Sequence, residues 1–529
     1  MKKHVIMVCD HIHESGLQML ASQPDIEYIN VADLPKDELL KVVGKADVVI
    51  TRSSTEVNQA FLEAATNLKA LVRAGVGVDN VDIEGCSKRG IIVMNVPTAN
   101  TIAAVELTMA HMLACMRAFP YAHNDLKLDR IWKREKWYGY ELKDKKLGII
   151  GFGNIGSRVG MRAKAFEMDV ITYDPYIDPA KATDLGVEYT TNFDDILACD
   201  VITIHTPKTQ ETIGMIGKEE IAKMKDGVVL INCARGGLYD EEALYEGLKS
   251  GKVRFAGIDV FVKEPATDNP LLDLDNITVT PHLGANTHES QYKIATQAAQ
   301  QALDAARGIS YPNALNLPIR ENEIPEYAKA YLELIQKIGF LAAQANRGPI
   351  KSLKVTGEGE IGEFVDSLAT FAAVGALKES LGETINYVNA DFVAKERGIE
   401  IRKEKTPARG AFKNRVALKL TSENGVIEIS GTIFNDNVQR IVEINGFALD
   451  VEPKGRMILF KNTDVPGVIG DVGHILAKHH VNISDFRLGR DKSSGMALAV
   501  IIVDNDVSEE VLKELDDLEA SVYVKYVIL

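Results

Sequence analysis

Short apolar runs alternate with helical patterns over the first half of the chain. In the N-terminal part, the runs predicted to be buried strands are His4–Val8, Asp47–Thr51, Lys69–Arg73 and Ile91–Met94. A second series has strand cores at Gly148–Ile150, Val170–Tyr173, Val201–Ile204, Val228–Asn232, Phe255–Val260 and Ile277–Thr280. Apolar runs separated by helical stretches are typical of βαβ units in parallel sheets. We therefore predict an α/β fold with two doubly wound, Rossmann-like parallel sheets.

Two long helical patterns, Asn100–Phe119 and Thr287–Arg307, lie on either side of the second series. Apolar residues at helical spacing behind polar starters indicate amphipathic helices at both places. The chain therefore enters and leaves the second sheet through a helix. We predict a first domain of residues 1–98 completed by 286–315, a second domain of 99–285 inserted into it, and a cleft between the two.

The chain changes character after Pro318. Residues 319–452 are predicted to form an α+β domain, with a helix over Glu326–Ala345 and a hairpin at Asn424-Gly425, a pair that suits a tight turn. This domain shows no motif that points to a chemistry. Residues 455–529 follow the order strand, helix, strand, strand, helix, strand, which is the ferredoxin-like βαββαβ pattern.

The composition narrows the class of protein. Apolar residues make up 46% of the chain and charged residues 26%, as in folded globular proteins. The net charge of −15 and the lack of a dense Lys/Arg tract argue against nucleic-acid binding. We expect no membrane span, since no apolar run reaches about 18 residues, and no export signal at the N-terminus. Five scattered cysteines without a CxxC pair favour the cytoplasm and predict no metal site.

A glycine motif marks the start of the second series. Gly151, Gly153 and Gly156 form a GxGxxG pattern directly after an apolar strand and before a helix. Such glycines permit a tight turn, close approach of the backbone to a pyrophosphate, and close helix–strand packing. The next strand ends in Asp174, near the expected offset for a carboxylate that binds ribose hydroxyls. We predict an NAD site rather than an NADP site, because Asp174 would repel a 2′-phosphate; the alternative for Asp174 is a turn cap.

Three polar side chains follow strand ends of the second sheet, where open α/β sheets bind ligands. They are Arg235, Glu264 and His282. Each alone also fits a surface ion pair, a solvated turn or a helix cap. Together they suit the oxidation of a carbon that bears a hydroxyl, in which a histidine takes the hydroxyl proton, a carboxylate supports the imidazolium and an arginine binds the substrate carboxylate.

These motifs resemble those of the D-2-hydroxyacid dehydrogenase family. The matching segments are Gly151–Gly156, Asn232–Gly237, Asp259–Pro265 and Pro281–Ala285. Arg52–Thr55 and Arg73–Asn80 narrow the resemblance to the long phosphoglycerate dehydrogenases, which have an intervening domain and a C-terminal ACT domain. The resemblance implies NAD-dependent oxidation of 3-phospho-D-glycerate to 3-phosphohydroxypyruvate, the first step of L-serine biosynthesis, with Arg235, Glu264 and His282 as the catalytic residues.

The resemblance also implies binding residues. The implied NAD contacts are Gly151, Gly153, Asn154, Ile155, Gly156, Asp174, Thr206, Cys233, Ala234, Arg235, Asp259, His282, Gly284 and Ala285. The implied substrate contacts are Arg52, Ser53, Gly75, Val76, Asn100, Arg235 and His282. Lys133 and Arg134 are further candidates for the substrate phosphate, across a subunit boundary, although a solvated charged turn suits their segment better.

The C-terminal domain resembles ACT domains that bind an effector. The resemblance implies L-serine as a feedback inhibitor, bound by Asn462, Asp464 and Asn482, and a homo-oligomer, either dimer or tetramer. Asn462 stands where relatives carry His or Tyr, which leaves the effector open, and an ACT domain that only joins subunits is the alternative. Two other functions also stay open: a hydroxypyruvate or glyoxylate reductase of the same family, and a non-catalytic NADH-sensing binding protein.

Overall fold

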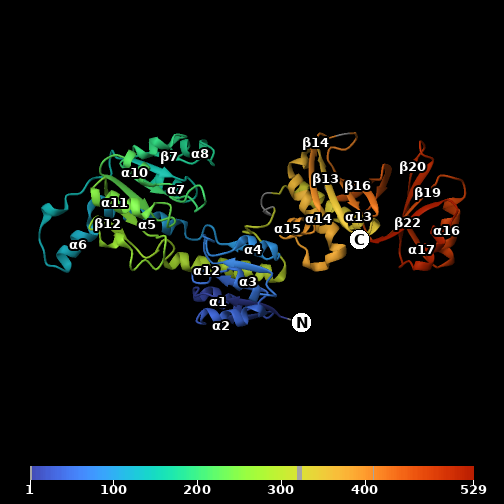
Figure 1. Ribbon diagram of the computed structural model, residues 1–529, viewed down its shortest axis with the longest axis horizontal. Helices are drawn as coiled ribbons and strands as arrows, with labels where there is room; N and C mark the ends of the chain where they lie inside the picture. The colour runs from blue at the N-terminus through green and yellow to red at the C-terminus, as the bar shows by residue number, and fades with distance from the viewer. Residues whose placement is uncertain (1–2, 319–323, 409, 436) are drawn as a thin grey trace.

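The computed structural model describes residues 3–318, 324–408, 410–435 and 437–529. The described strands form four sheets, each in its own lobe, and the first lobe lies between the second and the third (Figure 1). The predicted fold class is confirmed. The predicted start of the third domain, residue 319, lies outside the described residues.

The first sheet is parallel, with the strand order β2-β1-β3-β4-β5. Its strands are β1 (His4–Val8), β2 (Ile26–Asn30), β3 (Val48–Thr51), β4 (Ala70–Arg73) and β5 (Ile92–Asn95). Its helices are α1 (Glu14–Ala21), α2 (Lys36–Val42), α3 (Gln59–Ala64) and α4 (Ile83–Lys88). The four predicted strands are confirmed to within one residue. The edge strand β2 was not predicted.

The second sheet is also parallel, with the order β12-β11-β10-β9-β6-β7-β8. Its strands are β6 (Lys146–Ile150), β7 (Asp169–Tyr173), β8 (Glu188–Thr190), β9 (Val201–Ile204), β10 (Val228–Asn232), β11 (Val253–Ile258) and β12 (Ile277–Val279). Its helices are α7 (Gly156–Ala165), α8 (Ala180–Thr183), α9 (Phe193–Leu197), α10 (Lys218–Lys223) and α11 (Glu241–Ser250). The order reverses at β6, beside the glycine motif, which is where sheets of this kind bind dinucleotides.

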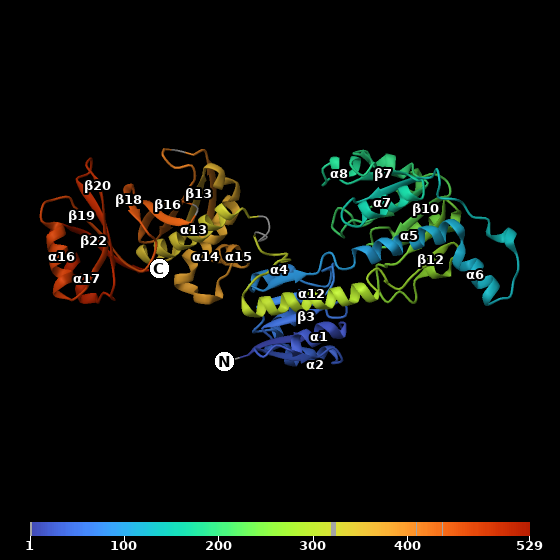
Figure 2. The same ribbon diagram turned by 180° about the vertical axis from the view of Figure 1, so that it is seen from behind.

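Two long helices join these lobes. The helix α5 (Thr101–Arg117) leaves the first lobe and packs on β10 and β11, and α12 (His288–Arg307) returns to pack on α1, β3 and β4 (Figure 2). Thr287 caps α12 by accepting a hydrogen bond from the Ser290 N–H. Among the described residues no single helix is long and apolar enough to cross a membrane. Only α5 and the following α6 (Phe119–Lys127) pass that test of length and composition together, with a bend of 68° between them.

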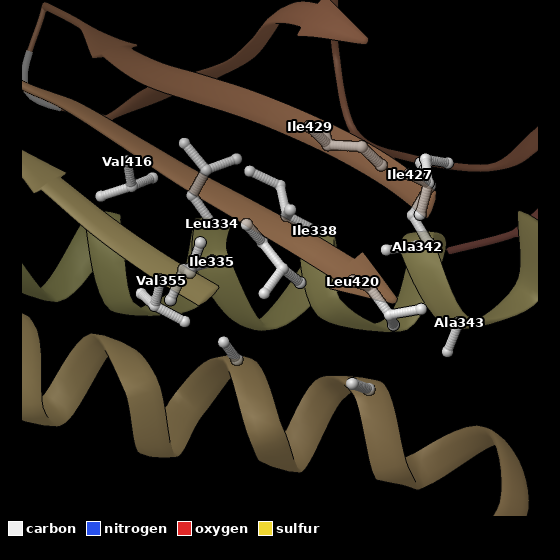
Figure 3. Packing of buried hydrophobic residues seen from close by; sticks show 14 of the residues in the cluster. Leu334, Ile335, Ile338, Ala342, Ala343, Val355, Val416, Leu420, Ile427 and Ile429 are labelled. Atoms are coloured by element: carbon white, nitrogen blue, oxygen red, sulfur yellow. The ribbon is translucent and has the colours of Figure 1, made fainter. Parts of the chain in front are cut away.

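The third sheet has the order β14-β13-β15-β16-β17-β18. Its elements are α13 (Glu326–Ala345), β13 (Ile350–Glu358), α14 (Val365–Leu381), α15 (Ala390–Glu396), β14 (Glu400–Thr406), β15 (Arg415–Ser422), β16 (Gly425–Phe434), β17 (Val438–Ile444) and β18 (Phe447–Val451). Apolar side chains of α13, such as Leu334 and Ile338, point at the strands (Figure 3). The predicted helix and hairpin are confirmed, with Ser422 opposite Gly425.

The fourth sheet has the order β20-β21-β19-β22 and is antiparallel. Its elements are β19 (Arg456–Thr463), α16 (Val468–Lys478), β20 (Ile483–Asp491), β21 (Met496–Val503), α17 (Glu509–Asp516) and β22 (Ser521–Ile528). Alternate residues of β19 face opposite sides: Phe460 packs with the helices, whereas Leu459 belongs to the core of the third lobe. The third and fourth lobes therefore share one apolar core.

Candidate active site

A cavity of about 770 Å³ is lined by residues of both the first and the second lobe. Ser53 and Ser54 come from the loop after β3, and Glu264 and His282 come from loops after β11 and β12. In each case the residue follows the carboxyl end of a parallel strand, where ligands of such sheets bind. The structure thus brings Ser53 into the same cavity as two of the three predicted catalytic residues.

His282 and Glu264 form a hydrogen-bonded pair. The Nδ1 atom of His282 lies 2.8 Å from Oε2 of Glu264, and the Phe261 N–H donates to Oε1 at 3.0 Å. Burial alone would raise the pKa of Glu264, but these two hydrogen bonds and the charges of His282 and Arg235 lower it below its ordinary value. Glu264 is therefore a carboxylate that accepts from Nδ1, and Nε2 is the ring nitrogen left for a ligand.

Three arginine side chains gather in this region: Arg52, Arg73 and Arg235. Burial, followed by the positive charges of Arg52 and Arg235, lowers the pKa of Arg73 to about 10. The Nε atom of Arg73 is buried and has no hydrogen-bond partner in the described part of the chain. Nε of Arg235 pairs with Asp79 at 3.1 Å. Arg73 was missed as a site residue, although it ends β4 and the strand-end rule applies to it as well.

The loop after β4 packs against these guanidinium groups. A Cβ atom at Gly75 would overlap Nη1 of Arg73, and one at Gly77 would overlap Nη2 of Arg235. The Gly75 N–H donates to the carbonyl of Arg73 at 2.8 Å, so a carboxylate bound there would have to share or replace that bond. The Asn95 side chain donates to the carbonyl of Val76 at 2.7 Å, which holds the loop in place.

The other predicted substrate residues do not line this cavity. The Arg52 guanidinium donates to the His11 carbonyl at 3.1 Å. Asn100 precedes α5, and its buried Oδ1 atom has no partner among the described residues. Lys133 and Arg134 lie on an exposed segment between α6 and β6 that projects from the second lobe, away from the first (Figure 2). Within one chain, therefore, the structure does not bring Lys133 and Arg134 to the cavity.

The glycine motif leaves room for a dinucleotide. A Cβ atom at Gly156 would collide with the carbonyl of Gly151, whereas one at Gly153 would meet no described atom within 4 Å. The backbone at Gly153 is thus open to a ligand. The helix α7 begins at Gly156 without a side-chain cap, so its first N–H groups can bind a phosphate. Oγ1 of Thr206, beside Gly151, is buried and unpaired within the described residues. These features fit NAD.

Asp174 lies against the same glycine loop. Its Oδ2 atom accepts from the Phe152 N–H at 2.8 Å, and its Oδ1 atom accepts from the Tyr176 N–H at 3.0 Å. The turn-capping bonds are therefore present. The carboxylate also stands beside the glycine loop, where the ribose of a bound dinucleotide is expected.

The remaining predicted cofactor residues lie in loops at the same edge of the sheet. Asp259 is fully buried and accepts from the Leu283 and Gly284 N–H groups at 2.7 and 3.0 Å. Burial raises the pKa of Asp259, and these hydrogen bonds oppose the increase. A Cβ atom at Gly284 would contact both Asp259 and the carbonyl of Cys233. The others follow β6, β10 or β12, namely Asn154, Ile155, Ala234 and Ala285.

The structure separates the predicted effector residues. Asn462 is buried and donates to the Thr463 carbonyl at 2.6 Å. Asp464 is paired with Arg490 at 2.6 Å, and Asn482 donates to Asp504 at 2.6 Å. Thr463 pairs with the first residue of β21 and Ile483 with the last. Asp464 and Asn482 therefore stand at opposite ends of β21, whose eight residues span about 23 Å in seven steps of ~3.3 Å.

Comparison with known proteins identifies the family. Residues 109–284 match the D-isomer specific 2-hydroxyacid dehydrogenase NAD binding domain, residues 327–445 the D-3-phosphoglycerate dehydrogenase intervening domain, and residues 456–520 the ACT domain. The chain is 39% identical to the D-3-phosphoglycerate dehydrogenase of Bacillus subtilis, over 99% of both chains. It is also 39% identical to that of Archaeoglobus fulgidus, over 99% of this chain and 100% of that one. The chain belongs to the D-3-phosphoglycerate dehydrogenase family.

A solved structure of a similar protein supports NAD as the cofactor of this member of the D-3-phosphoglycerate dehydrogenase family. D-lactate dehydrogenase from Aquifex aeolicus, complexed with NAD and lactic acid, is 30% identical, with a TM-score of 0.53 over 60% of this chain and 100% of that one. The chain is an NAD-dependent 2-hydroxyacid dehydrogenase, so the predicted family, enzyme class and cofactor are confirmed.

Proposed function

We propose that this enzyme oxidises 3-phospho-D-glycerate to 3-phosphohydroxypyruvate, the first step of L-serine biosynthesis. The observation that supports this substrate is the cluster of Arg52, Arg73 and Arg235 beside the His282–Glu264 pair. The substrate carries a carboxylate and a phosphate, with about three negative charges in all. Three guanidinium groups match that charge, and guanidinium binds carboxylate and phosphate with paired hydrogen bonds.

The chemistry follows from the hydrogen bonds of His282. Because Nδ1 is bonded to Glu264, Nε2 accepts the proton of the substrate hydroxyl as the carbonyl forms. The Glu264 carboxylate then stabilises the imidazolium. Arg235 binds the substrate carboxylate and polarises the neighbouring oxygen. The chemistry that bound NAD would supply is acceptance of a hydride, that is, of the hydrogen with its electron pair from the carbon. We assign its binding to the glycine loop, Asp174, Thr206 and the loops after β10, β11 and β12.

Relative rates with two substrates test this proposal. The purified enzyme with NAD should show a kcat/KM for 3-phosphoglycerate at least about 100-fold above that for D-glycerate, since two charge-assisted hydrogen bonds of ~1.5 kcal/mol each separate them. Arg73→Gln should reduce that ratio about tenfold. Arg89→Gln, at an exposed position beyond α4, is the matched control and should leave the ratio unchanged. Faster reduction of glyoxylate or hydroxypyruvate than of 3-phosphohydroxypyruvate would contradict the proposal.

We also propose that L-serine binds at a seam between two ACT domains of a homo-oligomer. Asp464 and Asn482 stand at opposite ends of β21, so a single ACT domain does not bring both predicted serine-binding residues to one place. The strand β20, at the edge of the sheet, begins after Asn482, and its other end carries Arg490, the partner of Asp464. Two copies related by a two-fold axis, with their β20 strands antiparallel, would place Asn482 of one near Asp464 of the other.

We propose, in addition, that the enzyme is cytoplasmic. All five cysteines are free thiols, which a reducing compartment favours.

A further inference from the structure

His111 is buried on the face of α5 that packs against the second sheet. Its Nδ1 atom lies 2.9 Å from Oγ1 of Thr278, and its Nε2 atom lies 2.8 Å from Oγ1 of Thr280. The glycine at position 257 makes room for the ring, since a Cβ atom there would lie 2.8 Å from the His111 Cβ. Burial lowers the pKa of His111 to about 4. The ring is therefore neutral near pH 7, with one nitrogen donating and the other accepting.

The partner of Thr280 decides which nitrogen donates. Oγ1 of Thr280 lies 2.6 Å from Oδ1 of Asp259, and within the described chain the other hydrogen bonds to this carboxylate come from N–H donors. A carboxylate only accepts, so the Thr280 hydroxyl donates to Asp259 and its oxygen accepts from Nε2–H of His111. Nδ1 then accepts from the Thr278 hydroxyl. The ring of His111 is therefore the tautomer with its hydrogen on Nε2, which follows from the donors and acceptors around it. The hydrogen bonds run in one direction, from Thr278 to Asp259.

Asp259 holds the loop that carries His282. Its carbonyl accepts from the His282 N–H at 2.9 Å, and its carboxylate accepts from the next two backbone N–H groups. The φ angle of His282 is +54°, in the left-handed region that residues other than glycine rarely adopt. A backbone in that region persists only where surrounding bonds impose it. The bonds to Asp259 therefore fix the backbone from which the imidazole reaches Glu264.

We infer that His111 is a positioning residue for the reaction: through Thr280 it orients Asp259, and Asp259 in turn places His282. The inference rests on the proposed function, because the step that it serves is the proton transfer assigned to His282. His111 acts from α5, beneath the sheet, and not by touching the substrate. The donor at Nε2 is the property that this role requires, since the Thr280 oxygen would otherwise lack the bond that aligns its hydroxyl with Asp259.

Four variants of the full-length enzyme test the inference. His111→Leu and Thr280→Val should lower kcat about tenfold or more, with the KM for 3-phosphoglycerate and the NADH Kd changed by less than about threefold. His111→Gln places an amide donor near the position of Nε2 and should restore kcat to within about threefold of wild type. Thr278→Val is the matched control. It removes an equivalent hydroxyl bonded to the same ring, on the side away from Asp259, and should lower the Tm but keep kcat within about twofold.

A purely structural role makes a different prediction. In that case kcat would fall in proportion to the loss of Tm across all four variants, with Thr278→Val as impaired as Thr280→Val. That pattern, or wild-type kcat in both His111→Leu and Thr280→Val, would overturn the inference. If His111→Leu does not fold, the comparison of kcat in Thr280→Val and Thr278→Val still distinguishes a positioning role from a purely structural one. A wild-type enzyme that fails to oxidise 3-phosphoglycerate would instead refute the proposed function, so the two failures are distinct.

Discussion

Gly77 lies directly against the guanidinium of Arg235, and this contact allows the role of Arg235 to be tested with a single added methyl group. A Cβ atom at position 77 would overlap Nη2 of Arg235 and lie 2.9 Å from both its Cζ and Oδ2 of Asp79. Normal contact between such atoms needs about 3.5 Å, so in Gly77→Ala the guanidinium must move by about 1 Å. The backbone at Gly77 is not in the left-handed region, so the contact is the main perturbation.

The expected cost falls on substrate binding rather than on stability. The guanidinium is the flexible end of a side chain and can move without disturbing the core. A displacement of about 1 Å weakens a charge-assisted hydrogen bond that is worth ~1.5–3 kcal/mol, so kcat/KM for 3-phosphoglycerate should fall about 10- to 100-fold. The NADH Kd and the Tm should stay close to wild type.

Initial rates at varied 3-phosphoglycerate, an NADH fluorescence titration and a melting curve measure these three quantities. Gly473→Ala is the matched control, because a Cβ atom there meets no described atom within 4 Å. Its methyl group should leave kcat/KM unchanged. An unchanged kcat/KM in Gly77→Ala would show that Arg235 does not bind the substrate from the position seen here, and the reasoning from the arginine cluster would fail.

Other outcomes are expected at three sites. His282→Ala should lower kcat by about 10²–10⁴ in steady-state assays while NADH binding, followed by fluorescence, changes little; unaltered turnover would refute its role as the base. Asp174→Ala should weaken the preference for NAD over NADP by about 1–3 kcal/mol, measured as the ratio of the two kcat/KM values. A constant ratio would leave Asp174 only as a cap for the Phe152 and Tyr176 N–H groups. L-Serine should slow turnover and give a calorimetric binding signal that Asp464→Ala abolishes. No heat in the wild type would leave the ACT domain with a structural role.

Local patterns in the sequence were sufficient to propose much of the candidate site. The GxGxxG motif, Arg235, Glu264 and His282 could each be singled out because they lie in loops that follow predicted strands of the second sheet. The edge strands β2 and β8 escaped prediction because both are partly exposed, so neither forms a continuous apolar run. Glu27 and Asn30 of β2, for example, are exposed.

Tertiary structure decided which of these residues meet. Arg73 belongs to β4 and Arg235 follows β10, so only the packing of the two lobes brings their charged side chains near each other. In the sequence His111 is one polar residue in an apolar helix, and only the packing of α5 shows that it contacts Thr280. Asp464 and Asn482 are close in the sequence, yet the register of β21 puts them at opposite ends of a sheet. The physical reason is the same in all three cases. The periodicity of apolar residues indicates which face of a helix or strand is buried. It does not indicate which residue packs against that face, because that depends on how elements distant in the sequence pack together.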